Sequence, residues 1–340
     1  MRPPYRILVL TDHSGHTSEN SLYGLVGALN SSGFCRYIDI GSRGCDVNRP
    51  FFQGIKTEVY VKRVRGDIFY SEDGSILTNA LIKSEVTDYD VILLRMPPPP
   101  DQVFFHHLSK WVSQRIILNR PSGIIETSSK EFLLQFRRLC APVCLCRTAE
   151  EVDAFSALFP IVLKPLTGYG GRGIIKIEND EVWIDGRKLG KNTFLSEFRR
   201  DGKVYLGMKY LRNVLLGDKR NIVVNGKLIG SSLRVPQEGG WMCNVALGGR
   251  STAAQPDERE MYISGELWKV LKELGIIIFG FDTLVDDNGD RVLSEINTMS
   301  VGGLVQTADH SGKPIVSEAV NLLWAYINDV VYGDIPVNFR

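Results

Sequence analysis

One stretch, KPLTGYGGRGIIKI at residues 164–177, restricts the fold of this chain more than any other. Four of the six residues from 168 to 173 are glycines. Glycines lose more backbone entropy on folding than other residues, so their concentration here favours close approach of a ligand to the backbone. The β-branched and polar run IIKIEND follows the glycines, which predicts a second strand rather than a helix. We therefore predict a hairpin whose tip is the glycine loop.

Several kinds of glycine loop bind phosphates, and their flanking residues distinguish them. Gly168, Gly170 and Gly173 match G-x-G-x-x-G, but a dinucleotide-binding turn needs a helix directly after it. A P-loop would end in G-K-[ST], whereas two isoleucines follow Gly173. A kinase-type loop lies between two strands, yet the H-R-D and D-F-G motifs are absent from the sequence. Lys164 supplies a cation at the loop entrance, and a glycine-rich hairpin without a ligand is the alternative.

A second signal is a group of oxygen-bearing side chains in GFDTLVDDNGDRVLSEIN, residues 280–297. Asn288-Gly289 favours a two-residue type I′ turn. In that register Asp282 faces Glu295 across the ladder, and Asn297 lies on the same face two residues further along. Facing carboxylates repel unless a cation bridges them, and hard oxygen ligands favour magnesium. The alternative is an acidic face that only solvates the strand, although Asp282 lies deep in an apolar run.

Composition excludes several classes of function. The 340 residues are 44% apolar and carry a net charge of +1, so nothing favours nucleic acid or an anionic membrane as a partner. No apolar run is long enough for a membrane helix, and the start lacks a secretory pattern. None of the six cysteines forms a C-x-x-C pair, although Cys144 and Cys146 share one side of a predicted strand. We expect buried, reduced thiols and a cytoplasmic location.

The first 120 residues predict an open α/β sheet. The apolar run at 6–10 is followed by a helix that ends near Gly33 and then by three strand-like stretches. The prolines of 96–101 break the chain after the last of these. Arg95 is thereby left at the carboxyl end of a strand, where open α/β sheets bind ligands.

The remaining sequence alternates short helices and strands. A capped helix is expected over 128–139, with Ser128 or Ser129 near its start, and another over 149–159. Residues 180–189 predict a hairpin, residues 203–211 a strand, and residues 264–274 a helix.

The chain resembles bacterial glutathione synthetase, a family of the ATP-grasp superfamily, from near its start to about residue 300. The most specific blocks are LLRMPPP, LNRPSGIIETSSKEF, IVLKPLTGYGGRGI, KYLRNVLLGDKRNIVVNGK, LRVPQEGGWMCNVALGGR and GFDTLVDDNGDRVLSEIN. The resemblance implies an ATP-grasp fold of the α/β class, α+β in its ATP-binding part, with a Rossmann-like open-sheet domain first. It also implies an amino-terminal substrate domain at 1–122, a lid at 123–203, and a carboxyl-terminal domain with the metal site at 204–340.

The same resemblance implies roles for individual residues. Those expected to bind ATP are Lys130 and Lys164 at the phosphates, Gly168, Gly170, Gly171 and Gly173 in the lid loop, Lys209, Tyr210 and Leu211 at adenine, and Asp218 at the ribose. Those expected at the transferred phosphate and acyl group are Arg220, Arg234 and Asn244. Those expected to bind substrate are Ser21, Arg95 and Ser300. Those expected to bind Mg²⁺, with Mn²⁺ as an alternative, are Asp282, Glu295 and Asn297.

Two segments depart from the family pattern. The family has an arginine two residues before the asparagine at 244, whereas this chain has Met242. A cation near the transferred group is therefore missing, or another residue such as Arg250 supplies it. After Asn297 the family continues with a serine-proline turn and a substrate-binding arginine, whereas this chain reads TMSVGGLVQTADHSGKP. Val301-Gly302-Gly303 forms either a backbone nest for a carboxylate or a simple turn. The acceptor amine is therefore the least constrained part of the interpretation.

The resemblance implies an ATP-dependent carboxylate-amine ligase that acts through an acyl phosphate. The substrates expected first are γ-glutamylcysteine and glycine, which give glutathione, in a homo-oligomer that binds small molecules or short peptides. A ligase for another acid and amine is the main alternative. A protein that binds ATP without turnover is the third hypothesis, and the retained lysines and metal-ligand candidates argue against it.

Overall fold

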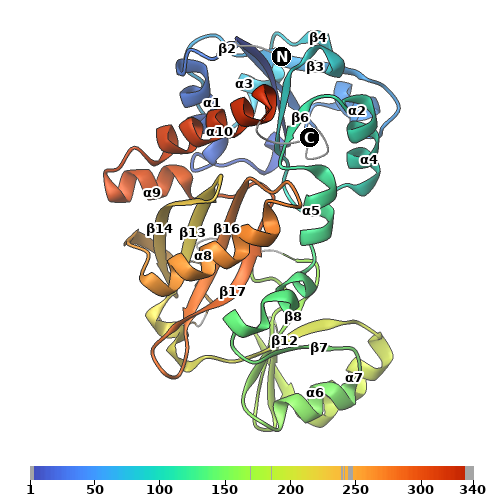
Figure 1. Cartoon of the computed structure of the whole chain (residues 1–340). Coiled ribbons are helices and arrows are strands. Elements are labelled where there is room, and N and C mark those ends of the chain that lie inside the picture. The colour runs from blue at the N-terminus through green and yellow to red at the C-terminus, as the bar shows by residue number, and fades with distance from the viewer. Residues whose placement is uncertain are drawn as a thin grey trace.

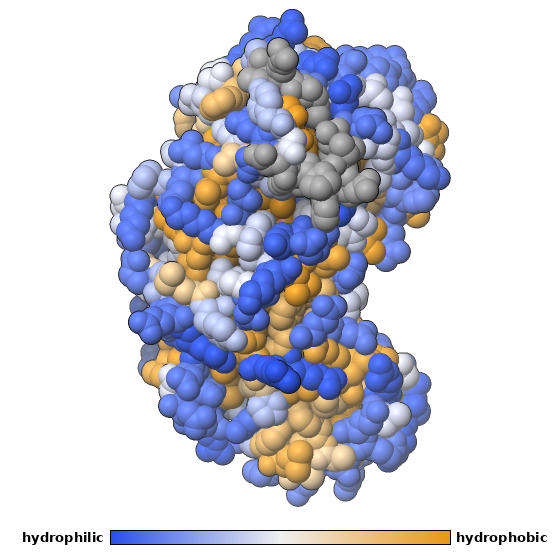
Figure 2. All heavy atoms as spheres, in the orientation of Figure 1, coloured by the Kyte–Doolittle hydropathy of each residue, from blue (hydrophilic) through white to orange (hydrophobic). Residues whose placement is uncertain are grey.

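The computed structural model describes residues 4–168, 170–184, 186–238, 240, 242–243 and 248–333. Three β-sheets follow one another along the molecule (Figure 1). The first sheet lies at one end, the third in the middle, and the second at the other end (Figure 1). A space-filling view shows the molecule hollowed on one side, between the part that carries the second sheet and the rest (Figure 2). None of the described helices is long and apolar enough to cross a membrane.

The first sheet is the predicted open α/β sheet, with strand order β4-β3-β2-β1-β5-β6. Its strands are β1 (Tyr5–Thr11), β2 (Cys35–Ser42), β3 (Glu58–Arg63), β4 (Ile82–Glu85), β5 (Val91–Arg95) and β6 (Ile116–Leu118). The four strands β2, β1, β5 and β6 are parallel, and β3 and β4 add an antiparallel edge. The carboxyl ends of β1 and β5 therefore meet at one edge, where Thr11 pairs with Arg95.

Helices cover both faces of the first sheet, which explains its continuous apolar strands. Ile7 and Val9 face the hydrophobic cluster that contains α1 (Ser21–Ser31) and α10 (Ile315–Tyr332), while Leu8 and Leu10 face the cluster with Phe51. The other helical segments of this part are η1 (His13–Gly15), η2 (Asp46–Asn48), α2 (Arg49–Phe52), α3 (Ser75–Thr78), η3 (Val86–Asp88) and α4 (Gln102–Trp111).

The last helix, α10, packs on the first sheet although the chain reaches it after the third. Trp324 of α10 stacks on Tyr5 of β1 with ring centroids 5.6 Å apart. The same hydrophobic cluster includes residues of the third sheet, such as Ile222 and Ile278. The carboxyl-terminal part expected at 204–340 therefore does not lie in one place, because its final helix completes the core of the first sheet.

The second sheet is antiparallel throughout, with strand order β11-β10-β9-β8-β12-β7. Its elements are β7 (Val143–Cys146), α6 (Ala149–Ser156), β8 (Ile161–Pro165), β9 (Ile175–Glu178), β10 (Glu181–Ile184), β11 (Arg187–Gly190), α7 (Lys191–Asp201) and β12 (Tyr205–Lys209). β8 and β9 pair directly, so the prediction that the glycine loop joins two strands of a hairpin is confirmed. The hairpin predicted over 180–189 is also present, and its strands pair from Glu181 to Gly190.

The second sheet has a hydrophobic cluster of its own, formed with residues of α6 and α7. Its strand β12 lies between β8 and β7, so the sheet extends to Lys209. The expected boundary at 203/204 would separate β12 from its sheet. The strand β12, which was expected to open the carboxyl-terminal domain, is instead an interior strand of the second sheet, because it pairs with β8 on one side and with β7 on the other.

The third sheet has strand order β15-β14-β13-β16-β17 and is also antiparallel. Its elements are β13 (Asp218–Val224), β14 (Lys227–Val235), β15 (Arg250–Ala254), α8 (Glu258–Leu271), β16 (Ile278–Val285), β17 (Arg291–Asn297) and α9 (Leu304–Ser311). The helix predicted over 264–274 begins earlier, because Asp257 and Glu260 form a capping box at its start.

The predicted pairing of Asp282 with Glu295 is confirmed, but the predicted turn is wrong. Asp286 and Asp290 close a three-residue loop in which Gly289 has φ +94°, and Val285 pairs with Arg291. That loop shifts the register by one residue from the prediction. A bulge then places one extra residue, Ser294, in β17 and restores the pairing beyond it.

Two segments connect the sheets. They are α5 (Pro121–Thr127) with η4 (Lys130–Leu139), and η5 (Arg212–Leu216). The helix expected over 128–139 is a 3₁₀ segment with a non-helical residue at Phe136, and Ser129 caps it as one of the two expected serines. Just before α5, the buried side chain of Asn119 accepts hydrogen bonds from the N–H groups of Ile277 and Ile278 and donates to the carbonyls of Ile278 and Thr298. It ties the end of the first sheet to the third.

We expect Asn119→Ala to lower the free energy of unfolding by about 3 kcal/mol, because it leaves several buried backbone groups without partners. Chemical denaturation followed by circular dichroism measures the change. Asn30→Ala is the matched control, since Asn30 makes only one exposed hydrogen bond, to Gly66. An Asn119 variant as stable as the Asn30 variant would contradict the assigned link between the sheets.

Candidate active site

A cavity lies between the second and third sheets. Its lining residues from the second sheet and the following segment are Val162, Lys164, Ile174, Met208, Lys209, Tyr210, Leu211 and Val214. The others are Asp218, Met242, Cys243, Asp282, Leu284, Ser294 and Glu295. One end is mainly apolar and the other is charged, so the cavity has the character of a nucleotide site. It brings together seven of the residues that the sequence predicts for ATP and metal binding.

Two lysines lie at the charged end. Lys164 on β8 is buried, its Nζ donates to the carbonyl of Ser294 at 3.0 Å, and burial lowers its pKa. Lys130, the first residue of η4, places its Nζ 3.4 Å from the carboxylate of Glu295 and donates to the carbonyl of Gly168 at 2.5 Å. The two ammonium groups therefore lie beside β17, which carries Ser294 and Glu295.

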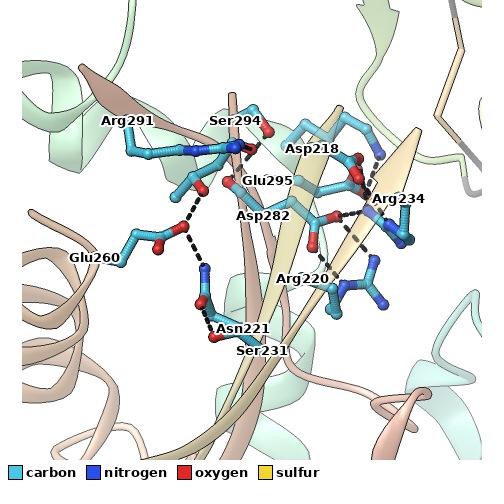
Figure 3. Close-up of polar contacts among 12 residues, drawn as sticks. Asp218, Arg220, Asn221, Ser231, Arg234, Glu260, Asp282, Arg291, Ser294 and Glu295 are labelled. Carbon is cyan, nitrogen blue, oxygen red and sulfur yellow. Dashed lines mark hydrogen bonds and ion pairs between the residues drawn. The ribbon is translucent and has the colours of Figure 1, made fainter. Parts of the chain in front are cut away.

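Buried charges gather on one face of the third sheet (Figure 3). Arg220 and Asp282 are directly paired on β13 and β16, and their side chains form a two-bond ion pair with Nη2 to Oδ2 at 2.8 Å. Arg234 on β14 bonds Asp282 at 2.9 Å and both oxygens of Asp218 at 2.7 and 2.8 Å. The four residues form one network, in which Arg234 is shared by two carboxylates.

The network sets the protonation of its acids. Burial alone would raise the pKa of Asp282, but the positive charges of Arg220 and Arg234 outweigh it and lower that pKa to about 2. Burial and the charge of Asp282 raise the pKa of Asp218, against the effect of Arg234. Asp282 is therefore a carboxylate throughout the physiological pH range, and its charge is neutralised by protein groups without a metal ion.

The predicted metal ligands lie together in the ladder. Asp282 pairs with Glu295, and Asn297 pairs with Gly280 two residues further on, so it lies on the same face. Asn297 has a buried amide nitrogen without a hydrogen-bond partner, and the oxygen and nitrogen of such an amide are interchangeable in placement. Asp282 accepts three hydrogen bonds, which leaves about one of the roughly four lone-pair sites of a carboxylate. The donor set thus fits a hard cation, although the described residues hold no cluster of three His, Cys, Asp or Glu.

The stretch Lys209–Leu211 borders the apolar end of the cavity. The N–H groups of Lys209 and Tyr210 already bond the carbonyls of Pro142 and Pro160. Lys209 also forms an ion pair with Asp287 at 2.5 Å, in the loop between β16 and β17. An adenine ring would therefore meet other backbone groups of this stretch than those two N–H groups.

The glycine loop joins β8 to β9 and contacts Lys130. Gly170, Gly171 and Gly173 all have positive φ, a conformation that glycine adopts without strain. Gly168 contributes the carbonyl that accepts from Lys130. The loop conformation thus requires these glycines, as the sequence pattern indicates.

A second cavity, of about 220 Å³, lies at the carboxyl ends of β1 and β5 and contains all three predicted substrate residues. Ser21 accepts from the N–H of Leu304 at the start of α9, and Ser300, with φ +43°, donates to the carbonyl of Met96 at 2.6 Å. Arg95 is 6% exposed and donates to the carbonyl of Val301, but its Nε has no partner. Burial lowers the pKa of Arg95 to about 10, so the group is still a cation at neutral pH.

A third cavity, of about 320 Å³, adjoins the second. The two share the lining residues Glu19, Gly302, Gly303 and Gln306. Arg220 and Arg234 line the third cavity, which therefore connects the arginine network with the pocket of Arg95. Gln306 donates to Glu19, and its buried Oε1 has no partner.

Some predicted features fall elsewhere. Asn244 lies outside the described residues. Met242 lines the nucleotide cavity, and Arg250 is exposed on the edge strand β15, where its neighbour Ser251 rather than Arg250 lines the third cavity. Gln306 was not singled out from the sequence. Its only local signal is its position in the first turn of a helix that begins directly after Gly302-Gly303.

Comparison with known proteins identifies the family. Residues 129–312, more than half of the chain, match the family model described as prokaryotic glutathione synthetase, ATP-grasp domain. The chain belongs to the prokaryotic glutathione synthetase family. A relative named glutathione synthetase, from Prochlorococcus marinus, is 30% identical over 242 residues, which cover 69% of this chain and 74% of the relative. One from Rhodopseudomonas palustris is 29% identical over 245 residues, 71% and 75% of the two chains.

Solved structures show how this glutathione synthetase family member is built. A D-cycloserine synthetase matches with a TM-score of 0.63 at 11% identity over 95% of this chain and 99% of that one. D-alanyl-alanine synthetase A from Vibrio cholerae matches with a TM-score of 0.57 at 13% identity over 95% and 98%. At such identities the likeness shows the ATP-grasp fold alone. With the family match, the protein is an ATP-dependent carbon–nitrogen ligase that joins a carboxylate to an amine.

The low pKa of Asp282 gives a prediction for stability in acid. A carboxylate with a lowered folded pKa stabilises the fold above its unfolded pKa, near 4, and the stabilisation disappears as the pH falls through about 2. We therefore expect the difference in free energy of unfolding between the parent and Asp282→Asn to shrink by about 2 kcal/mol from pH 5 to pH 2.

Denaturant unfolding at a series of pH values measures this difference. Asp46→Asn is the control, because Asp46 pairs with Arg49 on the surface with most of its side chain exposed. The change expected for Asp282→Asn should exceed any change measured for this control. A difference that does not depend on pH for Asp282→Asn would show that the two arginines do not hold its carboxylate ionised.

Proposed function

We propose that the ligase activates the carboxylate of an acid that carries an amino-acid head group, with γ-glutamylcysteine as the acid and glycine as the amine, to form glutathione. One observation carries the proposal. Among the residues that the structure describes, Nε of Arg95 and Oε1 of Gln306 are buried polar atoms without a hydrogen-bond partner, and both residues line the same cavity. The first is a cationic donor and the second is an acceptor, so the cavity lacks one anion and one N–H donor.

An α-amino acid head group supplies both. Its carboxylate would pair with Arg95, and its ammonium would donate to Gln306 and to the carboxylate of Glu19. Such pairing matters here because an unpaired buried cation is costly. His16 also lines this cavity, and burial lowers its pKa to about 4, so it adds no second positive charge.

The adjoining cavity gives the reacting carboxylate a route to the phosphate. An acid anchored at Arg95 would extend past Gly302 and Gly303 toward Arg220 and Arg234. Lys130 and Lys164 would hold the phosphates of ATP from the lid side. The acid carboxylate would then attack the γ-phosphorus, forming an acyl phosphate and releasing ADP.

Magnesium would be held by Glu295, Asn297 and the remaining lone pair of Asp282, and when bound it would neutralise phosphate charge. Arg220 and Arg234 retain N–H groups beyond those used by Asp218 and Asp282, and these would stabilise negative charge on the acyl phosphate. The amine would next attack the acyl carbon, an amide bond would form, and phosphate would leave. The glycine loop between β8 and β9 would exclude water from the intermediate.

A different amine acceptor is the second candidate. The observation that favours it is the lining of the third cavity, where Gly302, Gly303, Gln306 and His310 come from the segment that departs from the family pattern. An acceptor other than glycine would enter through this cavity while the acid and the nucleotide bind as above.

We also infer a substrate domain at 1–122, a lid at 123–203 and a homo-oligomer, as the family resemblance implies.

The proposal is tested by measuring ADP release with ATP, magnesium, γ-glutamylcysteine and glycine, omitting each in turn. We expect ADP that depends on both substrates and a product with the mass of glutathione. ADP that depends on the dipeptide but not on glycine would favour another amine. If no ADP is released even in the complete mixture, γ-glutamylcysteine is not the acid.

Arg95→Met is expected to raise the KM for the acid about a hundredfold, the effect of losing one charged hydrogen-bonded pair. The KM for ATP should change less than about twofold, because Arg95 lies outside the nucleotide cavity. Arg6→Met is the control, since Arg6 pairs with Asp90 at the opposite end of β1. An unchanged KM for the acid in Arg95→Met would remove Arg95 from the substrate site.

A further inference from the structure

Glu260 is a fully buried carboxylate that lines none of the three cavities described above. It belongs to the first turn of α8, behind the third sheet. Its oxygens accept from Lys219 Nζ at 2.7 Å, Asn221 Nδ2 at 3.2 Å and Thr283 Oγ1 at 2.5 Å, and from the N–H of Asp257 at 3.0 Å. A cap needs only the last of these bonds.

The three side chains that bond Glu260 are the immediate neighbours of the catalytic candidates. Lys219 and Asn221 flank Arg220 on β13, and Thr283 follows Asp282 on β16. Because successive side chains of a strand point to opposite faces, the face that bears Arg220 and Asp282 is the reverse of the face held by Glu260. Figure 3 shows Glu260 and Arg234 on opposite sides of these strands.

The ladder is irregular at this position. The register of β16 and β17 shifts between Asp282 and Thr283, where Ser294 is the extra residue. Backbone pairing with β17 therefore does not by itself fix the direction of Asp282. Ser294 donates to the carbonyl of Asp282 and Arg291 to the carbonyl of Thr283 (Figure 3). Glu260 is the charged group that fixes the side chains on the reverse face.

We propose that Glu260 is a positioning residue, which aims the Arg220–Asp282 pair at the phosphate end of the nucleotide cavity by binding Lys219, Asn221 and Thr283 from behind. The proposal rests on the roles given above to Arg220 and Asp282. It does not depend on which acid or amine the ligase uses, because Asp282 lines the cavity proposed for the nucleotide and Arg220 is paired with Asp282.

The test is the affinity for ADP, measured by isothermal titration calorimetry with and without magnesium. Glu260→Gln keeps the size of the side chain and its acceptor for the cap, but it removes the charge that Lys219 and Asn221 bind. We expect the gain in ADP affinity that magnesium provides to fall about tenfold, as when a group behind a metal ligand is changed. Affinity for ADP without magnesium should stay within about twofold of the parent.

Glu151→Gln is the matched control. Glu151 completes the capping box of α6, which packs on the second sheet. Glu151 is exposed, and among the described residues its carboxylate accepts hydrogen bonds from the backbone N–H groups of Arg147 and Thr148. Both variants lose some thermal stability, and only Glu260→Gln should lose magnesium-dependent affinity. Lys219→Gln combined with Glu260→Gln should recover part of the loss, because the two amides can bond each other and no buried charge is left unpaired.

Asp282→Asn distinguishes the two ways in which the test can fail. If Asp282→Asn loses the magnesium-dependent gain while Glu260→Gln keeps it and only melts earlier, Glu260 is a structural cap and the proposal is wrong. If neither variant loses the gain, Asp282 does not serve the nucleotide, and the site assignment on which the proposal rests fails instead.

Discussion

Asp282 is a buried carboxylate held by two arginines, and the arrangement of the third sheet follows from that interaction. Buried charges are tolerated only when they are paired and hydrogen-bonded. Arg220, Arg234 and Asp282 lie on three neighbouring strands, so the three strands must keep one register for the pairing to exist. A slip of one residue would turn Asp282 toward the reverse face of the sheet. The charges therefore link the fold to the geometry of the site.

The local sequence contained much of this arrangement. Strand and turn residues predicted the hairpin around the glycine loop and the carboxylate hairpin, because both depend on residues close together in the chain. The pairing of Asp282 with Glu295 was predicted from a two-residue turn, yet the loop has three residues and a bulge at Ser294 compensates. Asp282, Glu295 and Asn297 share one face because the bulge at Ser294 cancels the one-residue register shift that the loop introduces. The turn residues alone did not reveal this compensation.

Contacts between distant segments could not be read from the sequence. The repulsion between the facing carboxylates of Asp282 and Glu295 predicts a metal ion between them. In the structure Arg220 and Arg234 neutralise one of them and Lys130 lies 3.4 Å from the other. The unpartnered Nε of Arg95 and the position of α10 on the first sheet likewise depend on segments more than 200 residues apart. No periodicity or spacing within a strand signals such neighbours.

The arginine network of the third sheet is constrained by its neighbours more strongly than the residues that line the second and third cavities. The arginine network lies inside a sheet whose strands are paired on both sides, so a change there disturbs several charges at once. The lining of the second and third cavities is different, because Gly302, Gly303 and Gln306 belong to one short segment and helix at the edge of both. Substitutions in that segment alter the lining without moving the buried charges. Under the proposed function, substitutions in this segment would therefore change which substrates the two cavities accept, while the buried charges of the third sheet stay in place.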